Sequence, residues 1–212
     1  MQLANKGKLV METIEYRTVD KSSWGDGPWQ SEPDKKQWLD QETGLPSLIV
    51  RGPHGGLCGY VGVPKTHPYY GKDYDHESIS VDVHWGLTFA SHCAPAPTPE
   101  SWERFKDRGR RAWGEAARYP RGDAAQFLRD RAKELESYEA YVAWSEAAKV
   151  CHRVDSGEDD DVWWLGFDCA HSGDYSPAFD FTHDRGADAY RDQAFVEAEC
   201  RKLAKQLKDA AT

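Results

Sequence analysis

Two short runs of strand-forming residues, joined by a glycine-rich link, constrain the fold of this chain more than any other stretch. The runs are Leu48–Arg51 and Leu57–Val63, and the link between them is Gly-Pro-His-Gly-Gly. A link of this length that contains glycine is typical of a β-hairpin. Because a hairpin pairs its two strands antiparallel, we expect an antiparallel sheet built around this pair.

Two later segments extend the predicted sheet. Val81–Phe89 alternates with a period of two residues, which predicts a third strand with Trp85 on its core face and His84 on its polar face. Val162–His171 is apolar on both faces, which is typical of a central strand. Residues 1–22 alternate weakly and would supply an edge strand, so we expect four or five strands in all.

Helices are predicted in two places. Thr98-Pro99-Glu100 combines an N-cap hydroxyl, a proline at the first helical position and an acid in the first turn, which is typical of a helix start. Helical periodicity then continues through Ser101–Val150, which predicts a helical hairpin between two strands. Asp188–Asp209 carries an apolar stripe at helical spacing and predicts a closing helix.

The predicted fold is therefore α+β. We expect an antiparallel four- or five-stranded sheet packed by a C-terminal helix, with a helical hairpin inserted between strands. The chain would form a single domain over residues 1–212, with the helical insertion at residues 99–152. Ser23–Glu42 is punctuated by glycine and proline and carries three tryptophans. It is interpreted as an irregular arm that its indoles pin to the body, with one helical turn near Pro33–Trp38.

Composition disfavours several classes of function. The 36 acidic and 27 basic residues leave a net charge of −9, which repels a phosphate backbone, so we expect no generic nucleic-acid binding. Met1–Val10 lacks the apolar core of a signal peptide, and the longest apolar run, Val162–Phe167, is too short to span a bilayer, so we expect no membrane partner. Five cysteines without a CxxC spacing predict reduced thiols in a cytoplasmic protein.

Five phrases of the sequence resemble a family of small uncharacterised proteins carried by tailed phages and bacterial prophages. They are GPWQSEPDKKQWLDQETG, CGYVGVPKTHPYYGKDYD, VHWGLTFA, WWLGFDCAHSGD and YRDQAFVEAECRKLAKQL. The similarity covers roughly residues 24–92 and 162–208 and leaves out Ser101–Val150. This chain has His84-Trp85-Gly86 where the family would carry His-Gly-Gly, which argues against a tight glycine turn there. The resemblance implies a phage context, the host cytoplasm and a shared α+β core, but no particular reaction.

The candidate ligand-binding site combines the loop Lys65–Asp75 with polar residues of the third and fourth predicted strands. The loop offers aromatic rings for stacking, a cation and hydrogen-bonding acids, which suit a nucleotide-like small molecule. The predicted ligand-binding residues are His67, Tyr69, Tyr70, Lys72, Asp73, Tyr74, Asp75, His84, Thr88, Asp168, His171 and Asp174. We expect them on the sheet face that the C-terminal helix leaves open.

Three other site chemistries compete with this interpretation. Metal-assisted hydrolysis would draw on His67, His84, Asp168, His171 and Asp174. No ligand spacing such as HxxxH supports it, so structural histidines are favoured, and we assign no metal ligand and no cofactor. A meeting of His92-Cys93 with Cys151-His152 would offer zinc ligands, and Cys169 near His171 would offer a thiol nucleophile. For the thiol nucleophile at Cys169, a buried and inert thiol is the favoured interpretation.

The leading functional prediction is a small-molecule-binding protein that sequesters a host nucleotide signal, as a counter-defence, without turning it over. Its partner would be a nucleotide-like small molecule, and a homo-oligomer is also compatible with the sequence. One alternative is a hydrolase that acts on a nucleotide or a similar phosphorylated small molecule through His84, Asp168 and His171. Another is an interaction protein that inhibits a host enzyme through the tryptophan-rich arm and the basic segment Trp102–Arg121.

Overall fold

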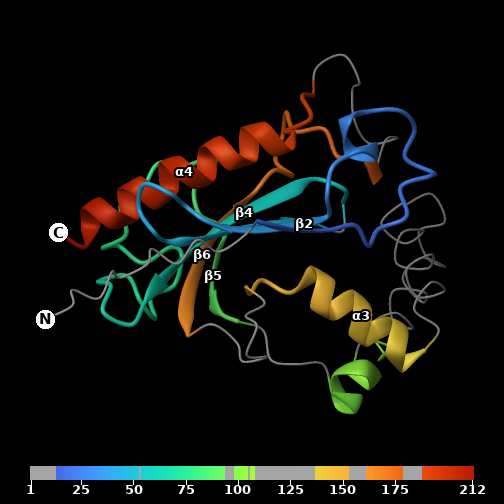
Figure 1. Cartoon of the computed structure of the whole chain (residues 1–212), viewed down its shortest axis with the longest axis horizontal. Helices are drawn as coiled ribbons and strands as arrows, with labels where there is room; N and C mark the ends of the chain where they lie inside the picture. The colour runs from blue at the N-terminus through green and yellow to red at the C-terminus, as the bar shows by residue number, and fades with distance from the viewer. Residues whose placement is uncertain are drawn as a thin grey trace, which may run out of the picture.

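The computed structural model describes residues 13–52, 54–93, 98–104, 106–107, 137–152, 161–178 and 188–212. In this part of the chain six strands form one antiparallel sheet in the order β1-β2-β3-β4-β6-β5 (Figure 1). The strands are β1 Ile14–Tyr16, β2 Lys35–Leu39, β3 Pro46–Arg51, β4 Leu57–Pro64, β5 Phe89–His92 and β6 Val162–Asp168. The helices include the short 3₁₀ helix η1 Pro28–Gln30, α3 Tyr138–Ala148 and α4 Gln193–Ala210, and residues 99–104 are also helical. The predicted α+β class is confirmed.

The predicted hairpin is the centre of the sheet. β3 and β4 pair antiparallel, with Arg51 opposite Leu57. The Gly52 N–H donates to the Gly56 carbonyl over 2.8 Å, and Gly55 adopts a φ of 85°, a left-handed conformation that glycine takes without steric cost. β6 then pairs with the other edge of β4, as a central strand should.

The strand count predicted from the sequence was too low because β2 was missed. Lys35–Leu39 lies in the segment that we expected to be irregular, with a helical turn at Pro33–Trp38. It is instead a strand between β1 and β3. Its buried positions include Lys35 and Gln37. Hydrophobic periodicity cannot reveal a strand whose inward side chains are polar, so the pattern was invisible in the sequence.

The third predicted strand was also wrong. Residues 81–88 form turns and extended chain alongside α4, and β5 begins only at Phe89. Side chains of α4 satisfy the backbone here, since Gln206 accepts from the Asp82 N–H over 2.7 Å and Glu199 accepts from the His84 N–H over 2.8 Å. Val83 is buried in the core beneath α4. The alternation therefore reflects packing against a helix rather than strand pairing.

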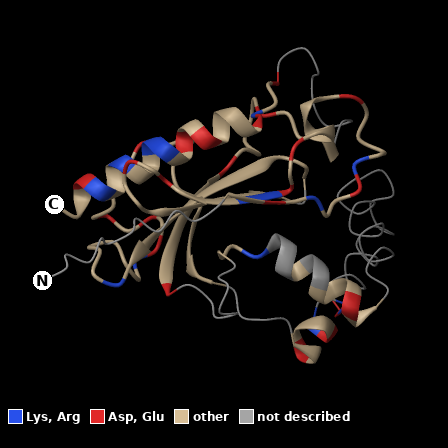
Figure 2. Cartoon of the chain, in the orientation of Figure 1, with Lys and Arg blue, Asp and Glu red and all other residues tan. Residues whose placement is uncertain are grey.

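α4 covers one face of the sheet, as predicted (Figure 1). Its buried stripe is Val196, Cys200, Leu203, Ala204 and Leu207. The Asp192 side chain caps the helix by accepting from the Phe195 N–H over 2.9 Å, so the helix starts at Gln193 rather than at Asp188. Along its solvent side, basic and acidic residues are interspersed (Figure 2). No described helix combines the length and the apolar character that crossing a bilayer requires.

The opposite face of the sheet carries a second, smaller core of Leu48, Val50, Tyr60 and Trp164. Cys93 and Val150 pack against it, and α3 lies on this side of the sheet (Figure 1). This face is therefore partly covered and is not the open ligand face that we expected. Of the predicted helical hairpin, residues 99–104 and α3 are helical, and residues 108–136 lie outside the described part.

A disulfide joins Cys93, just after β5, to Cys151, just after α3. The prediction that all five thiols are reduced is wrong for this pair. The prediction had no means of seeing that residues 58 positions apart meet in space. The pairing also removes both thiolates from the zinc site considered at His92-Cys93 and Cys151-His152. His152 is held separately, by a 2.8 Å hydrogen bond from its Nε2 to the Ser47 carbonyl.

The N-terminal arm is fixed to the sheet by a buried charge network around Arg51. The side chain of Arg51 has no exposed surface, and it donates to Asp34 Oδ1 over 2.8 Å, to Glu32 Oε2 over 3.3 Å and to the Tyr190 hydroxyl over 2.9 Å. Lys21 also pairs with Asp34, at 2.8 Å. Burial by itself raises the pKa of Asp34, but the hydrogen bonds from Lys21, two backbone N–H groups and Arg51 outweigh it and hold that pKa below its ordinary value.

We predict that the disulfide is detectable by thiol counting. Alkylation of the denatured protein without reductant should label three cysteines, namely Cys58, Cys169 and Cys200, and alkylation after reduction should label five. Closing a loop of this length restricts the unfolded chain, so reduction should lower the free energy of unfolding by about 4 kcal/mol. Mass spectrometry and urea titration measure the two effects. Five labelled cysteines without reductant would contradict the prediction.

We also predict that Asp34 contributes to acid sensitivity. A carboxyl whose pKa is lowered in the folded state stabilises the protein above its unfolded-state pKa, and this contribution is lost as the pH falls from about 4 through the folded-state pKa. Asp34→Asn should cost about 3–5 kcal/mol at neutral pH, because it removes the carboxylate that two buried cations, Lys21 and Arg51, share. Urea titrations at neutral and acidic pH should show a flatter pH dependence for this variant. The exposed Asp26→Asn should behave as wild type in both respects.

Candidate functional site

Three predicted site residues, His84, His171 and Asp174, come together at the end of β6. One ligand atom from each lies within 4.8 Å of the other two. His84 comes from the turn after residue 83, and the other two come from the loop that follows β6. We refer to these three residues as the His–Asp cluster. The sequence named all three of them, but it gave no spacing that would have joined them.

A tight turn places His171 and Asp174 side by side. The Asp174 N–H donates to the His171 carbonyl over 2.9 Å, and Gly173 within the turn has a φ of 90°, which favours glycine. The His171 N–H in turn donates to Asp174 Oδ2 over 3.1 Å. The carboxylate is therefore held by the backbone of its own loop.

Asp174 is the buried centre of the cluster. Its Oδ2 lies 2.8 Å from His84 Nε2, and its Oδ1 accepts from Arg191 Nε over 2.8 Å. Burial by itself raises the pKa of Asp174, but the hydrogen bonds from His84, Arg191 and the His171 backbone outweigh it and keep that pKa below its ordinary value. The Asp174 side chain is thus an ionised carboxylate with almost no exposure to solvent.

α4 positions His84 and Arg191 from its N-terminal end. The ring of His84 stands edge-on to Phe195, with centroids 5.3 Å apart, and Arg191 lies over the same ring at 5.1 Å. Glu199 on the next turn of the helix accepts from the His84 backbone. His84 therefore lies on the side of the sheet that α4 covers, not on the opposite face as we expected.

The predicted position of Trp85 differs most from the structure. This residue was assigned to the core face of a strand, yet it is 64% exposed. Its ring is stacked on His171, with centroids 5.5 Å apart and planes 18° from parallel. It occupies a left-handed conformation, with φ 56°, in a turn that the Gly86 N–H closes by donating to the Val83 carbonyl. A tight turn thus forms despite the tryptophan.

Asp168 joins the edge of the cluster, whereas Thr88 does not. Asp168 Oδ1 lies 3.5 Å from His171 Nδ1, and its side chain is partly exposed. Thr88 leads into β5 and donates its backbone N–H to the Gly166 carbonyl over 2.9 Å. The two are therefore not neighbours on one polar strand face, because the strand that would have aligned them does not exist.

The loop Lys65–Asp75 lies at the other end of α4. His67 is buried and donates from Nε2 to the Leu207 carbonyl over 2.8 Å, while His84 contacts Phe195. Phe195 and Leu207 are twelve positions apart in α4, which corresponds to about 18 Å along the axis. The single predicted site is thus split into two groups of residues.

The loop residues are mostly engaged with one another. His67 Nδ1 accepts from the Tyr69 N–H, Tyr70 packs on Trp163, and Lys72 donates to Ser78 over 2.7 Å. Tyr69 is buried in the core beneath α4. Of the remaining predicted residues, Asp73, Tyr74 and Asp75 are exposed. This loop has the structure of a packed connection with an exposed tip.

The free thiols are poor candidates for nucleophiles. Cys169 and Cys200 are buried, and burial raises the pKa of each thiol. Burial also raises the pKa of Cys58, to about 12. Because the thiolate is the reactive form, these groups are inert at neutral pH, which agrees with the interpretation favoured from the sequence.

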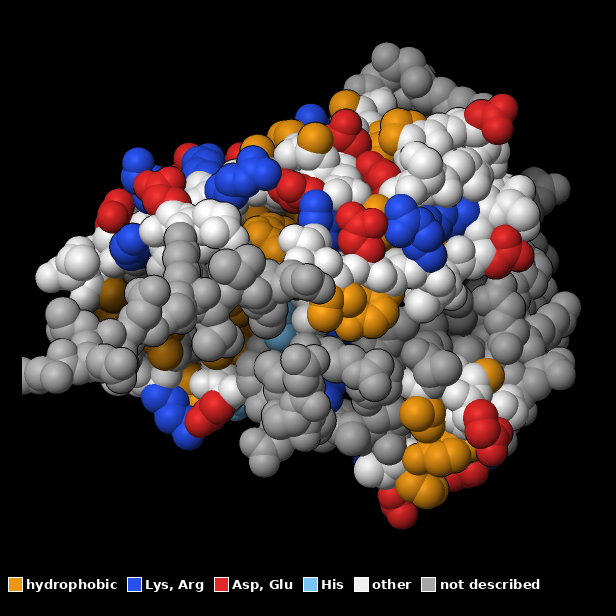
Figure 3. Space-filling view, viewed as in Figure 1, with side chains coloured by type: hydrophobic (Ala, Val, Ile, Leu, Met, Phe, Trp, Pro, Cys, Tyr) orange, Lys and Arg blue, Asp and Glu red, His pale blue; other side chains and the backbone are white. Residues whose placement is uncertain are grey.

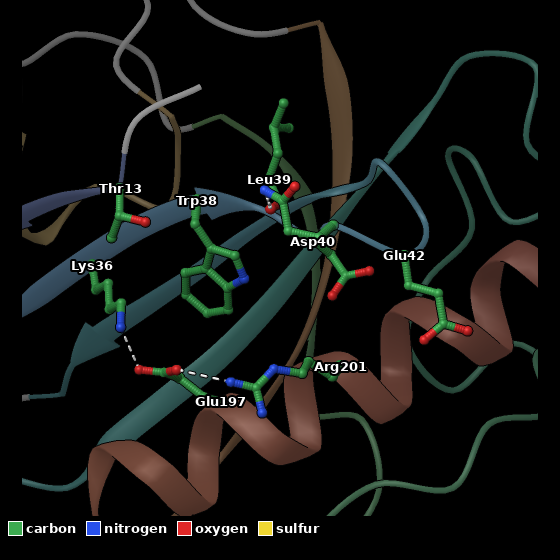
Figure 4. Close-up of a pocket in the computed structure, with 9 residues that line it drawn as sticks. Thr13, Lys36, Trp38, Leu39, Asp40, Glu42, Glu197 and Arg201 are labelled. Atoms are coloured by element: carbon green, nitrogen blue, oxygen red, sulfur yellow. Dashed lines mark hydrogen bonds and ion pairs between the residues drawn. The ribbon is translucent and has the colours of Figure 1, made fainter. Parts of the chain in front are cut away.

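A hollow of about 310 Å³ lies between β2 and α4 (Figure 4). None of its lining residues was predicted as a site residue. Lys36 and Arg201 both pair with Glu197 there, and Lys36 lies over the Trp38 ring. Asp40 and Glu42 also line the hollow, so two basic and three acidic side chains are mixed there, and no strong charge of one sign is present to select an ionic ligand. On the face seen in Figure 3, acidic and basic side chains are likewise intermixed among the described residues.

Comparison of the chain with protein-family models, with curated proteins and with solved structures finds no match. The candidate site therefore rests on its own geometry. Sequence reasoning missed two of its residues, Trp85 and Arg191. The signal that pointed toward Trp85 was its place between His84 and Gly86, where a turn favours glycine.

We predict that backbone strain at position 85 is measurable. Both Trp85→Gly and Trp85→Ala lose the indole, but only alanine keeps a Cβ in the left-handed conformation. The glycine variant should therefore be more stable than the alanine variant by about 1 kcal/mol in urea titrations. At Tyr74, which has no positive φ, alanine should be at least as stable as glycine. An alanine variant that equals the glycine variant at position 85 would contradict this.

Proposed function

We propose that this protein binds a planar, phosphate-bearing small molecule of the nucleotide type against Trp85 and holds it without turnover. The observation that carries the proposal is the indole itself. Trp85 is 64% exposed, and one face of its indole stacks on the His171 ring. Its backbone has a strained, left-handed conformation. Strain of this kind persists where the surrounding structure enforces it, and it clusters at ligand sites.

The groups around Trp85 suit the two halves of such a ligand. An exposed indole face stacks on nucleobases at a gain of about 1–3 kcal/mol per base. The partly exposed carboxylate of Asp168 would accept hydrogen bonds from base N–H groups. Arg191 uses its Nε for Asp174, and its half-buried guanidinium has four further N–H donors suited to phosphate.

The resemblance to phage proteins supplies the proposed setting. In the cytoplasm of an infected host, a protein that holds such a ligand would sequester a host-made nucleotide signal and so act as a counter-defence. Protein disulfides are uncommon in that compartment. Alkylation of the protein directly in cells therefore tests this setting. Free thiols at Cys93 and Cys151 would agree with the cytoplasm, and an intact disulfide would argue against it.

A hydrolase is the second candidate function, and the His–Asp cluster favours it. Two histidines and a carboxylate beside a stacking platform would place a catalytic group next to the phosphate of a bound nucleotide. The two functions differ in the fate of the ligand.

We predict that the protein retains a nucleotide from a panel and releases it unchanged when heat-denatured. Trp85→Ala should weaken the binding about 5- to 150-fold, because stacking is lost. Tyr74→Ala is the matched control, since it removes an exposed aromatic from the loop at the other end of α4 and should bind as wild type. Gel filtration followed by chromatography of the supernatant measures retention and ligand identity.

The other outcomes separate the alternatives. An altered ligand in the supernatant identifies a hydrolase. A loss of affinity in Tyr74→Ala but not in Trp85→Ala would move the site to the loop Lys65–Asp75. Neither retention nor turnover of any nucleotide would refute both proposed functions.

A further inference from the structure

We propose that His84, His171 and Asp174 form a binding site for a divalent transition-metal ion of the zinc type. The proposal requires no bound nucleotide and is independent of the function proposed above. It rests on the arrangement of three ligand atoms and on one buried ring nitrogen that has no hydrogen-bond partner within the described part of the chain.

The spacing of the ligand atoms fits a metal ion. Zinc bonds to imidazole nitrogen and carboxylate oxygen are about 2.0–2.2 Å long, so tetrahedral ligand atoms lie about 3.3 Å apart. In the cluster, Asp174 Oδ2 lies 2.8 Å from His84 Nε2 and 3.8 Å from His171 Nδ1. These two distances lie on either side of the required value, so small side-chain rotations would bring the atoms into coordination.

Asp174 presents one oxygen to both histidines. Arg191 donates to Oδ1, which lies 3.1 Å from His84 Nε2. Oδ2 is the closer oxygen, at 2.8 Å from His84 Nε2, and it lies 3.8 Å from His171 Nδ1. Metal-ligating carboxylates are commonly held by a hydrogen bond to a neighbouring group in this way. Arg191 is therefore a positioning residue for the proposed site, not a ligand.

His171 differs from the structural histidines of this protein. Both ring nitrogens of His67 are hydrogen-bonded to the backbone, and His152 donates to a backbone carbonyl. His171 Nδ1 is closed off from solvent, yet it has no hydrogen-bond partner among the described residues. Carboxylate oxygens of Asp168 and Asp174 lie 3.5 Å and 3.8 Å from it. A buried nitrogen surrounded by carboxylate oxygens is the setting that a cation would complete.

The donor set identifies the class of metal. Two imidazoles and one carboxylate suit zinc and the neighbouring transition metals better than magnesium or calcium, which prefer oxygen ligands. Three protein ligands leave a fourth tetrahedral position for water or substrate, as in catalytic zinc sites. His171 and Asp168 are partly exposed, so the cluster lies close to the surface beside Trp85.

The test is a titration of the chelator-treated protein with Zn²⁺ alone, followed by calorimetry, and with Co²⁺, followed by absorption. We expect one ion per chain. His84→Gln and His171→Gln should each weaken binding by at least about 100-fold, since each removes one of three ligands. His76→Gln is the matched control, because His76 is exposed and contacts only its own loop in the described structure, and it should bind as wild type.

Two controls keep the result interpretable. His171 is partly exposed, so His171→Gln should fold, and far-UV circular dichroism with thiol counting verifies this for each variant. The Co²⁺ complex should lack thiolate-to-cobalt absorption, which excludes binding at Cys169.

Failure of either proposal can be recognised separately. No Zn²⁺ binding by the wild type, or binding that both histidine variants retain, would overturn the metal site. Nucleotide retention that survives chelation would still support the proposed function. One Zn²⁺ bound through the histidines without any nucleotide retention would leave the metal site standing alone.

Discussion

The fully buried guanidinium of Arg51 is the interaction on which the rest of the structure depends. A buried cation is costly unless each N–H donor is satisfied, and here Asp34, Glu32, Tyr190 and two backbone carbonyls supply the acceptors. These partners come from the N-terminal arm, the central hairpin and the chain entering α4. One side chain therefore fixes the relative positions of three segments that are far apart in the sequence.

The same network sets the geometry of the candidate site. Glu32 bonds the Tyr190 hydroxyl and accepts from the Gln193 N–H at the start of α4. Arg191, the residue after Tyr190, holds Asp174. The orientation of the Asp174 carboxylate is thus linked, through two adjacent residues, to a buried ion pair on another part of the sheet. Rigid support of this kind is what a preformed binding site requires.

Local patterns predicted the α+β class, the β3–β4 hairpin and α4, because each depends on residues close in sequence. β2 was missed since its inward positions, Lys35 and Gln37, are polar and are satisfied only in the folded protein. At the site, residue chemistry identified His84, His171 and Asp174, but their proximity depends on how residues 81–88 run alongside α4. The exposure of Trp85 depends on the same path along α4, whereas alternation alone assigned this residue to the core.

The Cα atoms of Cys93 and Cys151 lie only 5.0 Å apart. The two ends of the segment between them are therefore close together beside the sheet, and the disulfide joins them. The length of this segment could change over evolution without moving β5 or β6, because neither strand has to shift to accommodate it. The attachment point of this segment lies at the start of β6, and the candidate site lies at the opposite end of that strand.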